Sequence, residues 1–463
     1  MSPTLSTVPL LLLAAYLYRK AHGQLIPVVM FMSIFEAASL VNVGAGRMAI
    51  GVQPAYCLMI LAIIKALWKS PGNVRKYGRL PKRATVLITL FVGYAMLSMF
   101  VGPKLFRGTL VFNPRLSPFE AVPLEWNSAF LNQLFYIVLL FVFYLVAAYR
   151  TTPAELIKSI NWFIGGAVCA ACIAIYQFAS FKIGLPFPSE ILHTGTYAIF
   201  EAYDLGEGVA RVNGSFPEAS SAAFTLTVAL ALVIWQILSG AIEFRNLTYA
   251  LLIITALMLT SSTTGYVCLL YIFAGAASLY LLRWKGSSEF RKAKLILAVP
   301  FAGMVLYVAA TPAMRDSVST VVHAVVLDKT KTSSYKERTE FNQIAIRSCF
   351  STYGFGVGWG VNRASSLFAT LLGNVGIPGS LFFCLFYIRI LSPGLHFLRL
   401  PLQVHGATLF ALGAALVDLT VATPDLVHCS LWLLFAVGAK LSVAERFSYP
   451  KSNQRTLLVP QQA

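Results

Sequence analysis

The sequence predicts an all-α, polytopic integral membrane protein with about 12–13 transmembrane helices and two larger periplasmic loops. Hydrophobic residues make up 57% of the 463 residues, whereas charged residues make up only 12%. The mean hydropathy is +0.72. Apolar runs of about 20 residues recur along the chain, and a helix of that length crosses the hydrocarbon core of a bilayer. Water-soluble proteins of this length do not have such a composition, so we expect the chain to fold in a lipid bilayer.

In chain order, the first apolar run covers 5–18 and precedes Arg19 and Lys20. It has no basic segment before it and no cleavage site of small residues, so we interpret it as a retained span and not as a signal peptide. The apolar runs that follow predict spans at about 24–42, 50–68, 85–103, 127–149, 160–180 and 219–239.

The run at 247–282 is too long for one crossing, because about 35 residues at about 1.5 Å per residue exceed the thickness of the hydrocarbon core. We therefore expect two short helices there, joined by a turn near 261–265. The remaining spans are predicted at about 295–311, 366–390, 404–421 and 427–443.

Short basic loops indicate the orientation of the spans. The loop at 69–84 is strongly basic and is predicted to lie in the cytoplasm by the positive-inside rule, as is the basic loop at 283–294. The resulting division is N-terminal helices (1–180), a periplasmic loop (181–217), central helices (218–311), a large periplasmic loop (312–364), C-terminal helices (365–443) and a cytoplasmic tail (444–463).

The formal net charge of +18 has two interpretations: cytoplasmic anchoring charge, or a basic surface for an anionic substrate. We assign most cations to anchoring and a few to a substrate. Nucleic acid is not an expected partner, because the basic residues are divided among short loops and form no continuous stripe. The seven cysteines lie mostly inside apolar runs without metal-ligand spacing, so we expect neither a metal site nor a cofactor.

The first predicted periplasmic loop ends in RVNGSFPEASSAAF, which begins at Arg211. Pro217 and Glu218 suit the first turn of the next helix, since proline lacks the N–H donor and a carboxylate favours a helix N-terminus. Glu218 is therefore either a helix-start residue or a functional acid. Arg211 is either a loop arginine paired with Glu207 or Asp204, or a cation for an anionic substrate.

The second predicted periplasmic loop continues into a long stretch, 333–379, that begins polar and becomes rich in glycine from Gly354 to Gly360. Arg338 lies in its charged part, between Lys336 and Glu340. This part is either an amphipathic surface helix with ordinary charge pairs or a source of cations for phosphate groups.

Together these two stretches resemble the O-antigen polymerase and O-antigen ligase superfamily. The first matches its R-x-x-G-x-F context through Arg211, Gly214 and Phe216, and the second matches its order of arginine, hydrophobic helix, glycine-rich turn and re-entry helix that closes at Gly376. The resemblance implies a bacterial inner-membrane protein whose active site faces the periplasm. It also implies an undecaprenyl-diphosphate-linked oligosaccharide as substrate, with a chain-length regulator as a further candidate partner.

The resemblance implies a metal-independent, inverting polysaccharide polymerase in which two arginines meet the diphosphate through paired hydrogen bonds. The expected catalytic residues are Arg211, Arg338 and Glu218, the last as candidate base. The expected substrate-binding residues are Lys336, Glu340, Arg363 and Gly358.

One position departs from the ligase branch. There a histidine opens the re-entry helix, whereas this sequence has Ser365. The departure favours polymerase over ligase and leaves the general base open. The candidates are Glu218, Glu340, His193 and His428, the last near Asp425.

Two acidic residues, Glu36 and Asp418, fall inside predicted spans, where charge is costly and usually functional. They support an alternative from another class, a polysaccharide flippase or transporter that uses a proton relay. A purely structural membrane scaffold is a third alternative. If the charged residues that activity requires lie in the outer loops, they would indicate the polymerase. If they lie at mid-membrane, they would indicate the transporter.

Overall fold

The computed structural model describes residues 2–3, 22–43, 50–68, 81–114, 116–117, 120–195, 203–204, 210–239, 243–282, 333–392, 404–422 and 424–444. The predicted spans at 5–18 and 295–311, most of the basic loop at 69–84, the loop at 283–294 and the tail from 445 lie outside the described residues.

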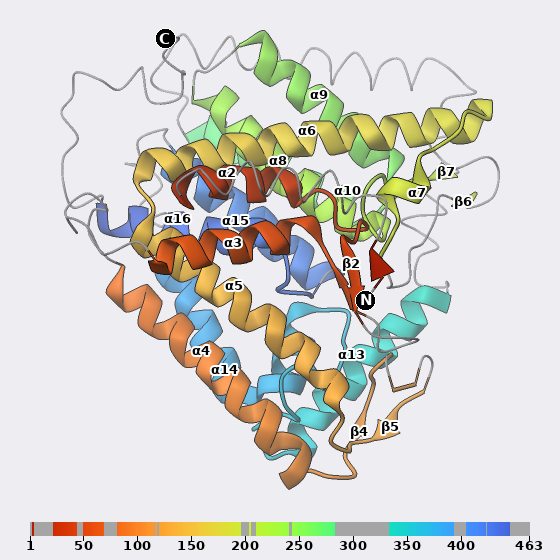
Figure 1. Ribbon diagram of the computed structural model, residues 1–463, viewed down its shortest axis with the longest axis vertical. Helices are drawn as coiled ribbons and strands as arrows, with labels where there is room; N and C mark the ends of the chain where they lie inside the picture. The colour runs from red at the N-terminus through yellow and green to blue at the C-terminus, as the bar shows by residue number, and fades with distance from the viewer. Residues whose placement is uncertain are drawn as a thin grey trace.

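The described chain is mostly helical (Figure 1). Its helices are α2 (His22–Met32), α3 (Pro54–Trp68), α4 (Lys82–Leu105), α5 (Leu131–Arg150), α6 (Pro153–Ile183), α7 (Ser189–Leu192), α8 (Ala219–Leu238), α9 (Phe244–Leu259), α10 (Thr263–Leu282), α13 (Ser333–Ser351), α14 (Leu367–Leu391), α15 (Val404–Val421) and α16 (Cys429–Ala444). Short antiparallel strands pair in the connections: β1 (Ser2–Pro3) with β2 (Val41–Val43), β2 with β3 (Ile50–Val52), β4 (Leu110–Val111) with β5 (Val122–Pro123), and β6 (Tyr203–Asp204) with β7 (Ala210–Arg211).

Within the described residues, five helices are long and apolar enough to cross a membrane. They are Lys82–Leu105, Ser128–Arg150, Pro153–Ile183, Ala219–Leu238 and Leu367–Leu391. The predicted pair of short helices at 247–282 is present as α9 and α10, separated by a turn. Several long, apolar helices of this kind are typical of a helical membrane protein.

The predicted span at 24–42 is wrong in its second half, and this changes the setting of Glu36. Helix α2 ends at Met32, where the Ser33 hydroxyl donates to the Met30 carbonyl at 2.7 Å. Beyond this point the backbone bonds to a neighbouring connection, because Ala37 N donates to Ser215 O at 3.0 Å. Glu36 therefore lies in the α2–α3 connection and not within a helix.

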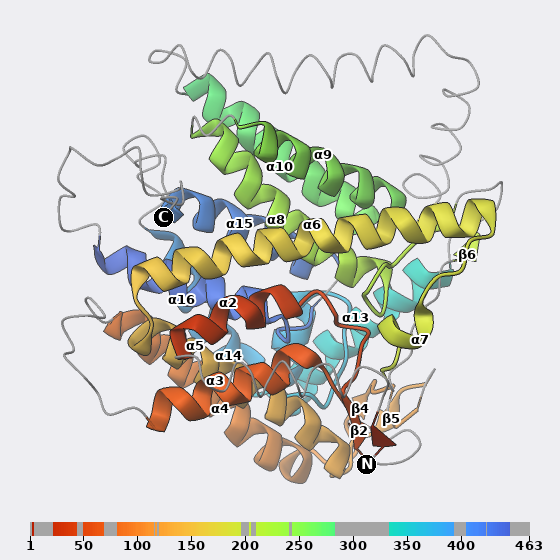
Figure 2. The ribbon, with the colours of Figure 1, turned by 45° about the horizontal axis from the view of Figure 1, so that its top comes forward.

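Helix α6 is longer than the span that the sequence predicts. It begins with a capping box, in which Thr152 and Glu155 bond each other's backbone N–H groups, and it ends at left-handed Gly184. Its 31 residues extend about 46 Å, beyond a hydrocarbon core of about 30 Å. Figure 2 shows α6 lying across the molecule, with α2 on one side and α9 and α10 on the other.

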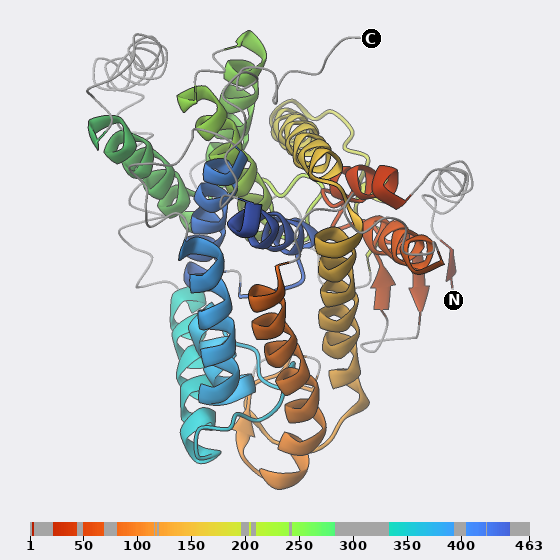
Figure 3. The ribbon, with the colours of Figure 1, turned by 90° about the vertical axis from the view of Figure 1, so that its left-hand side faces the viewer.

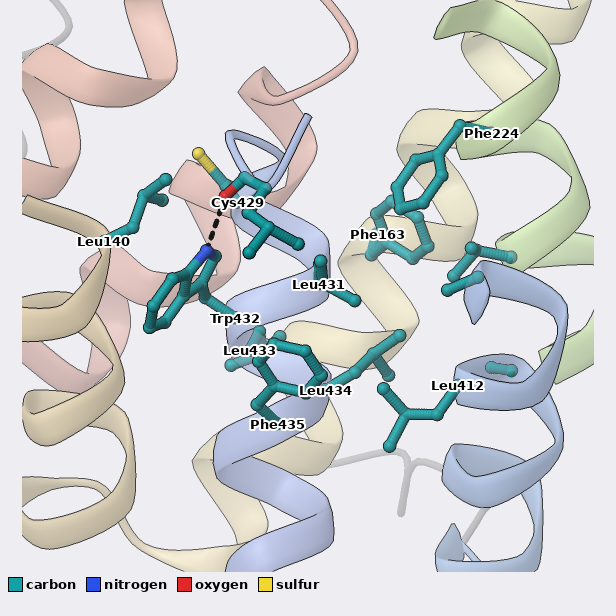
Figure 4. Close-up of a cluster of buried hydrophobic side chains, with 14 of the residues drawn as sticks. Leu140, Phe163, Phe224, Leu412, Cys429, Leu431, Trp432, Leu433, Leu434 and Phe435 are labelled. Carbon is teal, nitrogen blue, oxygen red and sulfur yellow. Dashed lines mark hydrogen bonds between the residues drawn. The ribbon is translucent and has the colours of Figure 1, made fainter. Parts of the chain in front are cut away.

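The core gathers around α8 and α16. All residues of α8 but Gln236 are buried, and α8 contacts α6, α9, α10 and α15. Trp432 and Phe435 of α16 are fully enclosed, and the Trp432 ring nitrogen donates to the Leu426 carbonyl at 2.7 Å (Figure 4). Figure 3 shows α4, α5, α13 and α14 extending together from this body.

The connections between helices meet at two opposite ends of the bundle. At one end, Arg363 N donates to Phe112 O at 2.7 Å, and Val212 N donates to Leu259 O at 3.4 Å. At the other end, the buried Lys440 ammonium of α16 donates to the Thr151 carbonyl, between α5 and α6. The end that contains the α2–α3, α6–α8, α13–α14 and α15–α16 connections carries the predicted site residues, and we call it the site end.

Candidate functional site

The segment that follows Arg211 is a rigid turn held by one glutamine. Gln177 of α6 accepts hydrogen bonds from Asn213 N at 3.0 Å and Gly214 N at 2.7 Å, and its Nε2 donates to Asn213 Oδ1 at 2.9 Å. Gly214 has φ +62°, a conformation that a β-carbon disfavours. Arg211 ends β7 immediately before this turn.

Glu218 is the N-cap residue of α8, as the helix-start interpretation predicts. Its backbone is extended, with φ −149° and ψ 161°, and its carboxylate makes no capping bond to a backbone N–H. The carboxylate instead accepts a hydrogen bond from the Ser220 hydroxyl and stays half-buried. A partly exposed carboxylate that is bonded to a hydroxyl, and to no backbone N–H of the helix, can still accept a proton as a base.

His193 supports the same turn from the α7 side. Its Nε2 lies 2.8 Å from the Gly214 carbonyl oxygen. Because a carbonyl only accepts, Nε2 carries the proton in this contact. His193 therefore holds the turn after Arg211 in place.

The charged residues of α13 lie on a helix that is docked through its apolar and amide side chains. Phe341 stacks on Phe112 with ring centroids 3.7 Å apart, and Asn342 Oδ1 accepts a hydrogen bond from Ser365 N at 2.8 Å. Arg338 is half-buried, whereas Lys336 and Glu340 are exposed. The side chains of Lys336, Arg338 and Glu340 have no ion pair within the described part of the chain, so the charge pairs expected of an ordinary surface helix are not seen there.

The glycine-rich turn fills a break in α14. Gly376 has non-helical angles, φ 61° and ψ −162°, and divides α14 into two half-helices. Val357 N and Gly358 N cap the first half-helix by donating to Gly373 O and Asn374 O, each at 2.9 Å. The backbone groups freed by the break are thus bonded by the turn, as an interrupted helix in a membrane requires.

Gly358 is required by sterics and backbone conformation. Its φ is +118°, and a β-carbon there would lie 2.8 Å from the Ser98 carbonyl oxygen of α4. Its N–H is already bonded to Asn374 O, so the structure gives this predicted substrate-binding glycine a packing role between α4 and α14. A role in binding substrate stays a prediction.

Two asparagines that the sequence analysis did not single out hold the turn beside Arg363. Asn362 accepts from Phe112 N at 3.0 Å through Oδ1 and donates to Ser348 Oγ at 3.0 Å. Asn374 bonds the backbone N–H and carbonyl of Asn362 with its side-chain amide. The sequence does contain a hint of this role. Each asparagine lies among glycine-rich or apolar residues, where burial of an amide without a hydrogen-bond partner costs free energy.

Arg363 projects from this bonded turn toward the α15–α16 connection. Its Nη2 lies 4.0 Å from Asp425 Oδ2, and the two side chains are 57% and 40% exposed. An exposed pair at this distance contributes little energy. The Arg363 guanidinium is therefore open to a stronger anionic partner such as a phosphate group.

Ser365 does not start α14. The N-cap residue is Ser366, one position later, and its side chain makes no capping hydrogen bond. The Ser365 backbone N–H is occupied by Asn342. Ser365 thus joins α13 to the start of α14.

The acids assigned to the membrane interior belong to a buried cluster. His428 Nδ1 lies 2.9 Å from Glu36 Oε1, and Asp418 of α15 accepts a hydrogen bond from the Cys268 thiol at 3.7 Å. Burial lowers the pKa of His428, but the carboxylate and hydrogen bond of Glu36, together with Asp425 and Asp418, raise it above its usual value. Glu36 and His428 lie 392 residues apart in the sequence, and only the fold brings them together.

Comparison with known proteins adds no assignment: no protein-family model matches the sequence, and no curated protein matches it. Among the described residues, no group of three or more His, Cys, Asp or Glu side chains is arranged to hold a metal ion. The features of the site end that bear on function are its cations, its acids and the broken helix.

Proposed function

We propose that this protein is a polysaccharide polymerase of the bacterial inner membrane, in the O-antigen polymerase and ligase superfamily. It transfers a growing glycan from undecaprenyl diphosphate onto a second lipid-linked repeat unit. Arg211, Arg338 and Arg363 meet the diphosphate, Lys336 and Glu340 contact the substrate, and Glu218 is the base. In this proposal the chain has about 12–13 spans, and the site end faces the periplasm.

One observation carries the proposal: separate segments that bear cations belong to one contact network at the end of an apolar bundle. Arg363 lies in the turn that bonds Phe112, and Phe112 stacks on Phe341, one helical turn after Arg338. The α15–α16 connection pairs with Arg363 through Asp425, and its His428 bonds Glu36.

The network then reaches the segment of Arg211. Ala37, next to Glu36 in the α2–α3 connection, donates to Ser215 O at 3.0 Å, four residues after Arg211. Several arginines at one end of a membrane protein suit a doubly charged phosphate leaving group.

The chemistry is a displacement at the anomeric carbon. The acceptor hydroxyl oxygen attacks C1 of the donor sugar, the C1–O bond breaks, and undecaprenyl diphosphate leaves with the electron pair. The hydroxyl proton passes to the Glu218 carboxylate. Guanidinium groups stabilise the charge that builds on the leaving phosphate, and direct attack inverts C1.

The bilayer supplies part of the catalysis in this proposal. Donor and acceptor are both lipid-linked, so both are held in one plane with their sugars at the membrane surface. Orientation of this kind contributes several kcal/mol to lowering a barrier. A chain-length regulator is the further candidate partner.

A deletion strain tests the proposal against its alternatives. For a polymerase, we expect single repeat units to accumulate on lipid while long chains disappear. Long lipid-linked polymer that is not attached to its final acceptor would indicate the ligase instead. Repeat units confined to the cytoplasmic leaflet would indicate the flippase or transporter, which the buried Asp418 favours as second candidate.

A further inference from the structure

A buried carboxylate–imidazole pair lies where three connections meet. The His428 side chain is 3% exposed and that of Glu36 is 15% exposed, with Nδ1 and Oε1 2.9 Å apart. The ring of Phe224 covers one face of the imidazole, with centroids 4.0 Å apart and planes at 17°. The proposed transfer reaction uses neither Glu36 nor His428.

The two nitrogens of His428 have different surroundings. Nδ1 faces the Glu36 carboxylate, which only accepts, so Nδ1 carries a proton. Nε2 is buried and has no hydrogen-bond partner in the part of the chain that the structure describes. In the neutral ring, Nε2 therefore holds the lone pair that takes up a further proton.

The titratable groups around His428 are acidic. Glu36 acts on it from the α2–α3 connection, Asp425 from its own connection and Asp418 from α15. Asp425 in turn faces a cation, the Arg363 guanidinium, at 4.0 Å.

The other elements packed here contribute neutral groups. α8 contributes the Phe224 ring, and α10 contributes the Cys268 thiol, which donates to Asp418. α3 contributes Tyr56, whose hydroxyl donates to the Val427 carbonyl at 2.5 Å. An added proton is thus stabilised by carboxylates and by the face of an aromatic ring.

We infer that Glu36 and His428 form an internal proton-binding site, in which Nε2 of His428 takes up the proton and Glu36 supplies the countercharge. The proton comes from solvent, and no bond other than N–H forms. Uptake converts the hydrogen bond between a neutral imidazole and the Glu36 carboxylate into an ion pair, and it strengthens the tie between the α2–α3 and α15–α16 connections. Because Asp425 of the latter faces Arg363, proton occupancy regulates how firmly the proposed diphosphate site is held; this last step rests on the proposed function.

Nuclear magnetic resonance of the full chain tests the site. The protein carries ¹⁵N-labelled histidine in lipid nanodiscs, and its imidazole signals are followed from about pH 5 to about pH 9. We expect one imidazole to titrate with a midpoint above the usual value of about 6.5. That signal disappears in His428→Gln, and its midpoint falls in Glu36→Gln.

His405→Gln is the matched control, because His405 is also a buried histidine but lies in α15, away from the pair. It should leave the shifted signal unchanged. If His428→Gln does not fold, His428→Asn provides the assignment, and if neither folds, the change in midpoint between wild type and Glu36→Gln decides. A His428 midpoint at or below about 6.5, or one unaffected by Glu36→Gln, would overturn the inference.

These measurements require no glycan substrate, so their outcome is independent of the proposed transfer reaction. If the pair titrates as expected but deletion of the protein leaves polymer length unchanged, the proton site is supported and the polymerase proposal is wrong. If deletion removes the long chains but His428 does not titrate, the polymerase proposal is supported and the proton site is wrong.

Discussion

Asn374, near the end of the first half-helix of α14, holds Asn362 by two hydrogen bonds. Its Oδ1 accepts from Asn362 N at 2.9 Å, and its Nδ2 donates to Asn362 O at 2.7 Å. The same Nδ2 also donates to Thr370 O at 2.8 Å, within the first half-helix. A single buried amide therefore fixes the residue before Arg363 to the helix that follows it.

Replacing this amide tests how much it contributes to the stability of the fold. In Asn374→Leu, the N–H and carbonyl of Asn362 lose their partners while staying buried, and each unsatisfied group costs about 1–3 kcal/mol. We expect the free energy of unfolding to fall by about 2–5 kcal/mol, measured by denaturant or thermal unfolding in detergent. Gln343→Ala, an exposed change on α13, should stay within about 0.5 kcal/mol. Equal stability of the two variants would contradict this account of the turn.

A second test compares two glycines. Gly358→Ala places a β-carbon 2.8 Å from the Ser98 carbonyl at φ +118°, so we expect a loss of about 1–3 kcal/mol from strain alone. Gly165→Ala in α6 meets nothing within 4 Å and should be neutral or stabilising by about 0.5–1 kcal/mol. Unfolding midpoints of the two proteins give the comparison. If Gly358→Ala is as stable as wild type, α4 and α14 do not pack as described.

The apolar runs predicted most helices but not the end of α2. Run length and turn residues locate α4, α8, α9, α10 and α14, because a bilayer sets helix length. Hydropathy does not reveal that residues after Met32 leave the helix, since the backbone groups there bond to Ser215 and Thr194, which are far away in the chain. Tertiary hydrogen bonding overrode the local pattern.

The site was predictable residue by residue but not as an arrangement. Glu218 at a helix start and Gly376 at the close of a helix follow from local chemistry, and the structure has both features. The pairing of Glu36 with His428 joins positions 392 residues apart, and no local pattern specifies it. Asn362 and Asn374 were missed because an asparagine in an apolar run has no preferred partner until the chain is folded.

Stability should depend on pH through His428. Its folded-state pKa is raised above the unfolded value of about 6.5, so the stabilisation is fully present below that value and is lost as pH rises through the folded-state pKa. We expect the melting temperature in detergent to be higher at about pH 6 than at about pH 8.5, and the difference to shrink in His428→Gln. A difference of the same size in both proteins would assign the pH dependence to another group.

The arginines have a charge-preserving test. A lysine keeps the positive charge but loses the planar pair of donors that meets a diphosphate, so Arg211→Lys and Arg338→Lys should lose most long-chain polymer. Arg347→Lys, an exposed change on the same helix as Arg338, is the control and should keep polymer near the wild-type amount. The measurement is polymer length and quantity in a complemented deletion strain. Near-normal polymer from either of the first two variants removes that arginine from the site.

The side of the membrane on which α13 lies is the property that the proposed reaction depends on most, because the assigned site residues must face the periplasm. Reporter fusions at about 75, in the basic loop, should indicate cytoplasm, since dense short-loop Lys and Arg stay on that side. Fusions near 335 should indicate periplasm, where lipid-linked repeat units are joined in the proposed reaction. Fusions near 190 in α7 serve as an internal control, because Thr194, just after α7, accepts a hydrogen bond from Ser39 at the site end, and they must agree with those near 335. If fusions near 335 indicate cytoplasm, Arg338 and Arg363 cannot take part in the proposed reaction, and the polymerase proposal is wrong.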